Sequence, residues 1–216
     1  MSRASEFVEA LAACRLPNVF NPYSDACPEH DLDASPTIRR KNLVAVIEGA
    51  LGVGIDTIWI GRDLGYRGGR RTGLALTDEV HLSVVQSIYR TALIEQATAT
   101  GPVAERTAGE VWRMIREIPH PPFLWNVFPF HPHQSDDPMS NRCHTTKEAG
   151  ACEDITATLL NWLKPSRVVA LGKEAHKALV RFGLTSNYVR HPSYGGQSEF
   201  AACIRAIYGL PAVSTV

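Results

Sequence analysis

The sequence predicts a single-domain α/β/α sandwich with a central four-stranded parallel sheet. Short apolar runs, of the kind that form strands buried on both faces, alternate along the chain with segments of helical periodicity. This alternation is typical of parallel sheets covered by helices. The chain has 216 residues, of which 44% are hydrophobic, enough for one substantial core. We therefore expect residues 1–216 to form one domain.

Before the first strand, the sequence predicts an irregular arm and then a helix. Residues 17–36 are rich in Pro, Asp and Ser, which favours an irregular segment over the core. In residues 37–51, apolar side chains follow the i, i+3, i+7 spacing of a helix, which Gly52 and Gly54 end. The apolar run 57–60 then predicts the first buried strand.

Three further strands are predicted, with helices between them. Thr77 can cap a helix whose apolar spacing continues to Leu93, and a helix over 107–117 is stopped by prolines. The remaining predicted elements are a strand at 123–128, a helix around 155–163 ended by Pro165, a strand at 167–171 closed by Gly172, a helix at 174–182, a weaker strand at 188–190 and a last helix at 197–208. Such alternation implies a parallel sheet with helices on both faces.

Composition and charge exclude several classes of protein. Lys+Arg and Asp+Glu are both 22, which speaks against nucleic-acid binding through overall charge but not against a local basic patch. No stretch approaches the ~20 apolar residues of a membrane span, and charges within residues 1–11 argue against a signal peptide. The five cysteines form no CxxC pair and indicate free thiols in a reducing compartment. We expect a cytoplasmic monomer that does not bind membranes.

Three polar side chains stand at the ends of predicted strands: Asp63, Asn126 and His191. The carboxyl ends of parallel strands meet at one edge of the sheet, where such sheets bind ligands. A carboxylate there can orient a water molecule, and a buried amide must be hydrogen-bonded. Each residue also has a structural interpretation: Asp63 as a turn cap, Asn126 as a core hydrogen-bonding group and His191 as a buried ring. Their placement at one edge makes them a candidate site.

Five segments resemble motifs of the uracil-DNA glycosylase superfamily, in the order of that superfamily. Gly61-Arg62-Asp63-Leu64-Gly65 is similar to the first motif, whose acidic or amide residue handles the attacking water. The other four are Thr72–Leu76, similar to the segment with a base-stacking aromatic; Phe123–Asn126, similar to the strand with the uracil-reading asparagine; Arg167–Gly172, similar to the strand before the last crossover helix; and His191–Ser193, similar to the second catalytic motif. The similarity covers residues 57 to about 200.

The resemblance implies a monofunctional glycosylase that hydrolyses the N-glycosidic bond of uracil in DNA. Asp63 would position water and stabilise the sugar cation, His191 would donate to O2 of the leaving base, and Asn126 would read its O4/N3 edge. The further substrate contacts implied are Arg62, Gly65, Tyr66 and Leu76. The loop with Ser193 and Tyr194 would bind DNA, enter the minor groove and fill the vacated stack. Water is the nucleophile, and no cofactor is implied.

Departures from the pattern bear on selectivity and on metals. Gly65 replaces the aromatic that blocks 5-methyl groups, so we expect room beside C5 and activity on 5-substituted uracils. Leu76 stands where an aromatic would stack on the base. Asn141-Arg142, Glu148 and Cys152 resemble the iron–sulfur branch, but Phe130 replaces one of its cysteines, so no four-thiolate cluster is expected. A zinc site would have to use His131, His133, Cys143 and His144, whose spacing matches no closed structural site. No metal is predicted.

Residues 67–71, here called the arginine loop, contain Arg67, Arg70 and Arg71 among glycines. Arginine guanidinium groups and glycine backbone N–H groups bind phosphate well, which predicts that these arginine side chains bind the DNA backbone. The alternative is that the loop is a solvated turn. The loop has no histidine, which disfavours the branch of the superfamily that crosslinks itself to DNA. Two other functions stay open: a glycosylase for deaminated purines, and a damaged-DNA-binding module without catalysis.

Overall fold

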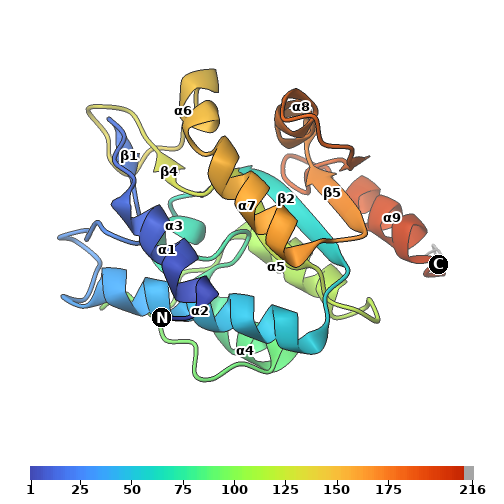
Figure 1. The fold of residues 1–216 in the computed structure, drawn as a ribbon, viewed down its shortest axis with the longest axis horizontal. Helices are drawn as coiled ribbons and strands as arrows, with labels where there is room; N and C mark the ends of the chain where they lie inside the picture. The colour runs from blue at the N-terminus through green and yellow to red at the C-terminus, as the bar shows by residue number, and fades with distance from the viewer. Residues whose placement is uncertain (212–216) are drawn as a thin grey trace.

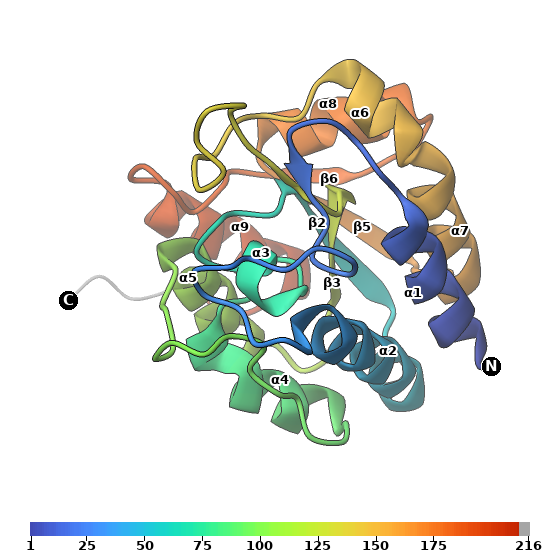
Figure 2. The same ribbon diagram turned by 90° about the vertical axis from the view of Figure 1, so that its left-hand side faces the viewer.

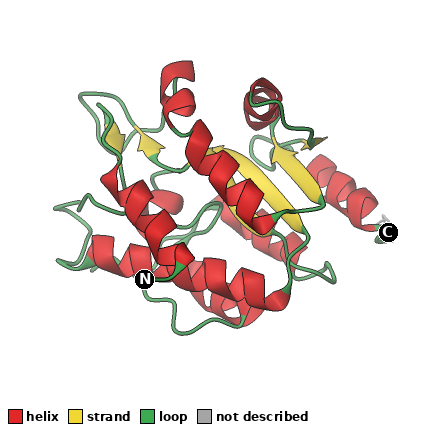
Figure 3. Cartoon of the chain, viewed as in Figure 1, coloured by secondary structure: helices red, strands yellow, loops and turns green. Residues whose placement is uncertain are grey.

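A four-stranded parallel sheet lies at the centre of the molecule (Figures 1 and 3), in a computed structural model that describes residues 1–211. Its strands are β2 (Thr57–Asp63), β3 (Phe123–Phe128), β5 (Arg167–Leu171) and β6 (Asn187–Val189). They follow the order β3-β2-β5-β6, and every neighbouring pair is parallel. The predicted fold class is therefore confirmed.

Helices cover both faces of this sheet (Figure 2). On one face lie α1 (Arg3–Ala13) and α7 (Glu153–Leu163), and on the other lie α5 (Arg106–Ile115) and α9 (Gln197–Tyr208). The other elements are β1 (Val19–Phe20), α2 (Ser35–Val53), α3 (Gly69–Thr72), η1 (Glu79–His81), α4 (Leu82–Tyr89), β4 (His131–Pro132), α6 (Thr146–Ala151) and α8 (Lys173–Arg181). Among residues 1–211, no helix has the length and apolar character needed to cross a membrane.

Two buried tryptophans on neighbouring strands point to opposite faces, as the two-residue period of a strand requires. Trp125 on β3 packs against Phe7 of α1, with ring centroids 5.7 Å apart. Trp59 on β2 packs against Phe200 of α9, with ring centroids 6.1 Å apart, and its indole N–H donates to the Tyr208 hydroxyl at 3.1 Å. Large aromatic side chains thus fix α1 and α9 to the two faces of the sheet.

The N-terminal region is more regular than the sequence predicted. Helix α1 was not predicted; the Ser2 hydroxyl caps it by accepting from the Ser5 N–H at 3.2 Å. The irregular arm at 17–36 contains β1, which pairs antiparallel with β4, and its last two residues already belong to α2. Proline is tolerated in the first turn of a helix, where its missing N–H has no intrahelical partner, so Pro36 opens α2 and does not prevent it.

Two other helices differ from prediction for local reasons. The helix expected at 77–93 starts later, because Asp78 and not Thr77 supplies the cap, and ends at Tyr89, where Arg90 takes a left-handed conformation with φ 51°. Helix α6 was not predicted, although Thr145 and Glu148 form a reciprocal capping box at its start.

The strand order creates a switch point at β2. From β2 the chain passes to β3 on one side, and later crosses over to β5 on the other side. The connections therefore leave in opposite directions and open a crevice at the carboxyl ends of β2 and β5, the usual ligand site of such sheets. Asp63 ends β2 and Gly172 follows β5, so both lie at this crevice.

Candidate active site

A cleft of about 600 Å³ lies at the carboxyl ends of β2 and β5. The residues around it come from distant parts of the chain: the loop after β2, the segment before α5, the segment before α6, the start of α8 and the loop after β6. Its lining includes Asp63, Leu76, Glu105, Cys143, His191 and Tyr194. Two of the three strand-end residues singled out in the sequence, Asp63 and His191, thus share one cleft.

Asp63 is an oriented, charged carboxylate. Its side chain is 8% exposed, and its Oδ2 accepts from Arg62 Nε at 2.8 Å and from the His144 N–H at 3.3 Å. The His144 ring lies beside it, with Nδ1 3.4 Å from the same oxygen. Burial alone would raise the pKa of Asp63, but His144 and Arg62 together hold that pKa below its ordinary value. The carboxylate is therefore ionised at neutral pH.

His191 is a neutral ring with its donor face free. Its Nδ1 accepts from the Ser193 N–H at 3.2 Å and lies 2.8 Å from the Ser193 hydroxyl. A backbone N–H can only donate, so in the neutral ring the proton is on Nε2. Burial, with a smaller effect from Arg62, lowers the pKa of His191 to about 4 although Asp63 opposes this. Within residues 1–211 both hydrogen bonds of the ring involve Nδ1, which leaves the Nε2–H available to a ligand.

Gly172 makes room for this histidine. It takes a φ of 94°, and a Cβ built there would lie 3.2 Å from the Cβ of His191. The left-handed backbone and the close approach both favour glycine at this position. The Gly172 N–H also donates to the Val189 carbonyl at 2.7 Å, which ties the end of β5 to the end of β6.

Asn126 is the least satisfied polar side chain of the region. It is 1% exposed, and within the described residues neither Oδ1 nor Nδ2 has a hydrogen-bond partner. Gly61 is its register partner on β2, and a Cβ on Gly61 would lie 2.4 Å from Asn126 Oδ1 and 3.1 Å from the cleft residue Leu76. Leaving a buried amide unpaired costs about 1–3 kcal/mol, so such a group calls for an explanation.

The other predicted substrate and DNA contacts lie in or near the cleft. Arg62, Gly65, Leu76, Ser193 and Tyr194 line it. The hydroxyl of Ser193 is within hydrogen-bonding distance of the His191 ring, as described above. Tyr66 does not line the cleft, but its N–H donates at 3.0 Å to Asn141, which does. Tyr194 is 95% exposed with a left-handed φ of 52°, and Gly195 follows with φ 78°. An aromatic ring therefore projects from a tight turn at the cleft rim.

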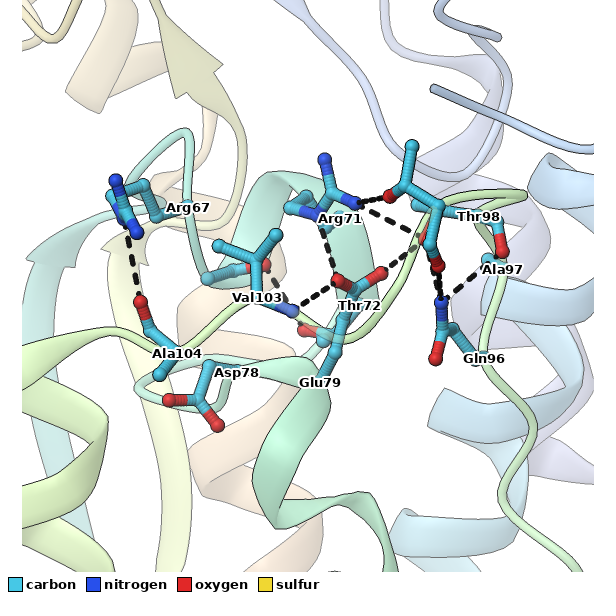
Figure 4. Close-up of polar contacts among 12 residues, drawn as sticks. Arg67, Arg71, Thr72, Asp78, Glu79, Gln96, Ala97, Thr98, Val103 and Ala104 are labelled. Atoms are coloured by element: carbon cyan, nitrogen blue, oxygen red, sulfur yellow. Dashed lines mark hydrogen bonds and ion pairs between the residues drawn. The ribbon is translucent and has the colours of Figure 1, made fainter.

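The prediction that Arg70 and Arg71 grip DNA is wrong, because both side chains are buried (Figure 4 shows the contacts of Arg71). Arg71 Nε donates to Glu79 Oε2 at 2.8 Å, and the same carboxylate accepts from the Val103 N–H. Arg70 donates to the Pro138 carbonyl at 3.0 Å and stacks on the ring of Phe20, 3.8 Å from its centroid. In both cases the guanidinium holds separate segments of the fold together.

Arg67 alone of these three arginines is exposed, and its Nε donates to the Ala104 carbonyl at 3.3 Å (Figure 4).

Within the described residues, no group of three or more His, Cys, Asp or Glu could hold a metal ion. His131 accepts from Arg70 and faces the Ser140 carbonyl through Nε2 at 2.9 Å, and burial lowers its pKa to about 4. Its two ring nitrogens are thus engaged inside the protein.

Sequence reasoning missed two residues of the cleft region. The sequence indicates His144 only as a candidate zinc ligand, yet it contacts Asp63 and packs against Phe128, with ring centroids 5.4 Å apart. Glu105 precedes α5, and a Cβ on Gly65 would lie 2.9 Å from its Oε1. The expectation of open space beside Gly65 is therefore wrong: the Glu105 carboxyl occupies it. Neither residue lies in a motif, since their partners are 81 and 40 positions away, and no local pattern could have identified them.

Comparison with known structures gives a match over nearly the whole chain. The crystal structure of wild-type SMUG2 from Pedobacter heparinus matches with a TM-score of 0.63 and 12% sequence identity, covering 97% of this chain and 97% of that chain. No family model matches the chain, and no curated protein matches it in sequence. The two proteins share a fold. Because the identity is low, the match establishes the fold and leaves the chemistry to the residues of the cleft.

Proposed function

We propose that this protein is a DNA glycosylase that hydrolyses the N-glycosidic bond of uracil in DNA and leaves an abasic site. The observation that carries the proposal is the unpaired Asn126 amide, which is buried beside Gly61, next to Leu76 of the cleft that Asp63 and His191 share. An amide with one donor and one acceptor free can pair with the O4 and N3–H of uracil, a pattern that cytosine does not present. The fold shared with SMUG2, a protein of the uracil-DNA glycosylase superfamily, supports the same reaction class.

In the proposed reaction, the target nucleotide is flipped out of the duplex into the cleft, which costs a few kcal/mol. The bond between C1′ and the base nitrogen breaks, and the electron pair leaves with the base while positive charge develops on the sugar. Asp63 stabilises that charge and accepts a hydrogen bond from the water that attacks C1′. The Nε2–H of His191 donates to O2 of the base, where negative charge develops.

Tyr194 has the shape needed to fill the gap that the flipped base leaves. The residue is 95% exposed on a tight turn at the cleft rim, so its ring can meet DNA without rearrangement of the protein. We propose that it enters the minor groove and stacks in the vacated position. Arg67 and Lys173, which are exposed near the cleft, are the proposed phosphate contacts in place of the buried Arg70 and Arg71.

The test is a cleavage assay on an oligonucleotide with a single uracil. The purified protein should release free uracil and leave an alkali-labile site, whereas a matched oligonucleotide with cytosine should stay intact. Asp63→Asn should bind the uracil oligonucleotide without cleaving it. Binding of the damaged strand by the wild-type protein with no release of uracil would overturn the proposal and favour the non-catalytic binding module. Release of hypoxanthine or xanthine but not uracil would redirect it to deaminated purines.

A further inference from the structure

The segment before α6 holds the backbone of His144 firmly. On one side of it, Arg142 pairs with both carboxylate oxygens of Glu148, at 2.7 and 2.9 Å, and its Nε donates to the His133 carbonyl at 2.8 Å. On the other side, Thr145 and the same Glu148 form the capping box of α6. His144 therefore lies between two anchored residues.

The ring of His144 is held as well, and it faces Asp63. The side chain is 6% exposed and packs against the ring of Phe128 on β3. Nδ1 lies 3.4 Å from Asp63 Oδ2, which is longer than an ordinary hydrogen bond, and it has no hydrogen-bond partner in the described part of the chain. A ring nitrogen that faces a carboxylate is favourable when it carries the proton, because two lone pairs would otherwise repel. His144 is therefore a buried donor directed at the carboxylate.

Within residues 1–211, the polar contacts of the Asp63 side chain all go to one carboxylate oxygen. Oδ2 is contacted by Arg62 Nε, by the His144 N–H and by the His144 ring, whereas Oδ1 takes part in no hydrogen bond or ion pair. Arg62 is held in its turn, because its Nη1 donates to Cys143 Sγ at 3.0 Å. Residues 143 and 144 therefore hold Oδ2 from two directions and leave Oδ1 free for a ligand of the cleft that Asp63 lines.

We propose, resting on the proposed function, that His144 is a positioning residue whose ring holds Oδ2 of Asp63 so that Oδ1 meets the water molecule that attacks C1′. His144 does not line the cleft, so it acts through Asp63 and not on the substrate. Hydrogen bonds of an active site are often long in the free enzyme and shorten in the substrate complex, which is the behaviour expected of the 3.4 Å contact. A displacement of a reacting group by about 1 Å can lower the rate about 100-fold.

The same contact acts on the charge of Asp63. Burial raises the pKa of this carboxyl, and His144 and Arg62 lower it to below its ordinary value. Removing the ring should therefore raise that pKa, and the loss of activity on acidification should begin at a higher pH. The other charged or titratable groups that face Asp63 or Arg62 in the described chain are Arg142, Cys143, Glu174 and His191. They come from the segment before α6, from α8 and from the loop after β6, and a substitution of His144 does not remove them.

Two substitutions separate the donor from the packing. His144→Phe keeps an aromatic ring against Phe128 but has no donor, whereas His144→Asn places an amide N–H near the position of Nδ1. We expect single-turnover cleavage of uracil DNA to fall about 10- to 100-fold in His144→Phe and to be largely retained in His144→Asn, with DNA affinity unchanged in both. The acid limb of the pH–rate profile should move to higher pH in His144→Phe. His176→Phe is the matched control, because His176 also packs beside an aromatic ring, that of Tyr188, and contacts Ser186 outside the cleft.

A double-mutant cycle tests whether His144 acts through Asp63. In the Asp63→Asn background the carboxylate is already lost, so His144→Phe should reduce the residual cleavage rate little further. A purely structural role of His144 would lower the rate by the same factor in both backgrounds. Equal factors would therefore overturn the inference and leave the proposed function intact.

The single variants can also overturn it. A wild-type rate and pH profile in His144→Phe, or equal losses in His144→Phe and His144→Asn, would do so while the proposed function survives. If His144→Phe lacks a cooperative urea transition, His144→Leu, which is smaller and also has no donor, must cleave more slowly than His144→Asn. Wild-type protein that releases no uracil would overturn the proposed function and this inference with it.

Discussion

The cleft and the arginine loop are neighbours in the structure, since Gly69 of the loop lines the cleft, but they differ in how their polar side chains are satisfied. In the cleft region, both amide atoms of Asn126 and the Nε2 of His191 lack partners within the described chain. In the arginine loop, Arg71 binds Glu79 and Thr98, and Arg70 binds Pro138 and stacks on Phe20. Both regions looked functional in the sequence, because both concentrate groups that can bind a ligand.

The difference lies in which groups have been left unsatisfied. A buried polar group with its full set of partners stabilises the fold, whereas one left without partners destabilises it unless a ligand completes it. Residues that break the ordinary rules of packing and hydrogen bonding occur mainly at functional sites. Asn126 is such a departure, and Arg71 is not. Variants in the cleft should therefore change activity more than stability, and variants in the arginine loop should do the reverse.

The largest effect is expected for Asp63→Asn. Because the carboxylate is held ionised and acts on charge that develops in the transition state, we expect single-turnover cleavage of uracil DNA to fall by roughly 10²–10⁴-fold. Affinity for the same DNA, measured by fluorescence anisotropy, should change little. Asp136→Asn, at an exposed position, is the control.

A wild-type rate in Asp63→Asn would contradict this assignment and require another acid. Asp78 and Glu79 are poor substitutes, since each already accepts several internal hydrogen bonds. Equal losses of cleavage and of folding stability would mean instead that Asp63 acts mainly through its contacts with Arg62 and His144.

Arg71→Ala should give the largest loss of stability. It leaves the Glu79 carboxylate, whose side chain is fully buried, without its guanidinium partner, and breaking one side of such a pair typically costs about 3–5 kcal/mol. Urea unfolding monitored by tryptophan fluorescence is the measurement. The rate per folded molecule should stay near wild type. A variant as stable as wild type that binds DNA weakly would restore the original interpretation of Arg71 as a phosphate contact.

Much of the fold could be predicted because β2, β3 and β5 begin as short apolar runs and many breaks between elements are glycines or prolines. The predictions that were missing or wrong concern residues whose structure depends on contacts outside their own segment. Helix α1 packs its apolar residues against the core through contacts such as Phe7 with Trp125, more than one hundred positions apart. The same limit explains the error at Arg71. An arginine between glycines is compatible with phosphate or with a buried carboxylate, and only the position of Glu79 decides between them.

The candidate site, like the fold, was predicted only in part. Asp63 and His191 follow strands, and the ends of parallel strands meet at one edge, so sheet topology alone brings them together. Glu105 and His144 reach the cleft region from segments outside the sheet. Their positions depend on how loops pack, which has no sequence period.

His191→Ala should reduce the rate by about 10²–10³-fold, the usual effect of removing a donor to a developing anion. The ring should titrate near pH 4 by NMR, with Nε2 protonated above that pH. Unfolded histidine takes up its proton near the ordinary value of 6.5, so this residue makes the folded state less stable as the pH falls from about 6.5 to about 4. A ring that titrates near 6.5, or one protonated on Nδ1, would rule out the neutral donor role.

The smallest effect is expected for Arg67→Ala, and it tests what remains of the arginine loop as a DNA contact. Arg67 is exposed, and within residues 1–211 its one hydrogen-bond partner is the Ala104 carbonyl, so a phosphate can reach its guanidinium. Removing one phosphate contact should reduce the slope of log affinity against log salt concentration by roughly 0.7–0.9, equally for uracil-containing and undamaged DNA. Cleavage at saturating protein should not change. Arg116→Ala is the matched control: Arg116 follows the far end of α5, on the order of 15 Å along the helix from Glu105, and should leave the slope as it is. An unchanged slope in Arg67→Ala would mean that this arginine, like its two neighbours, serves only to hold the protein's own backbone.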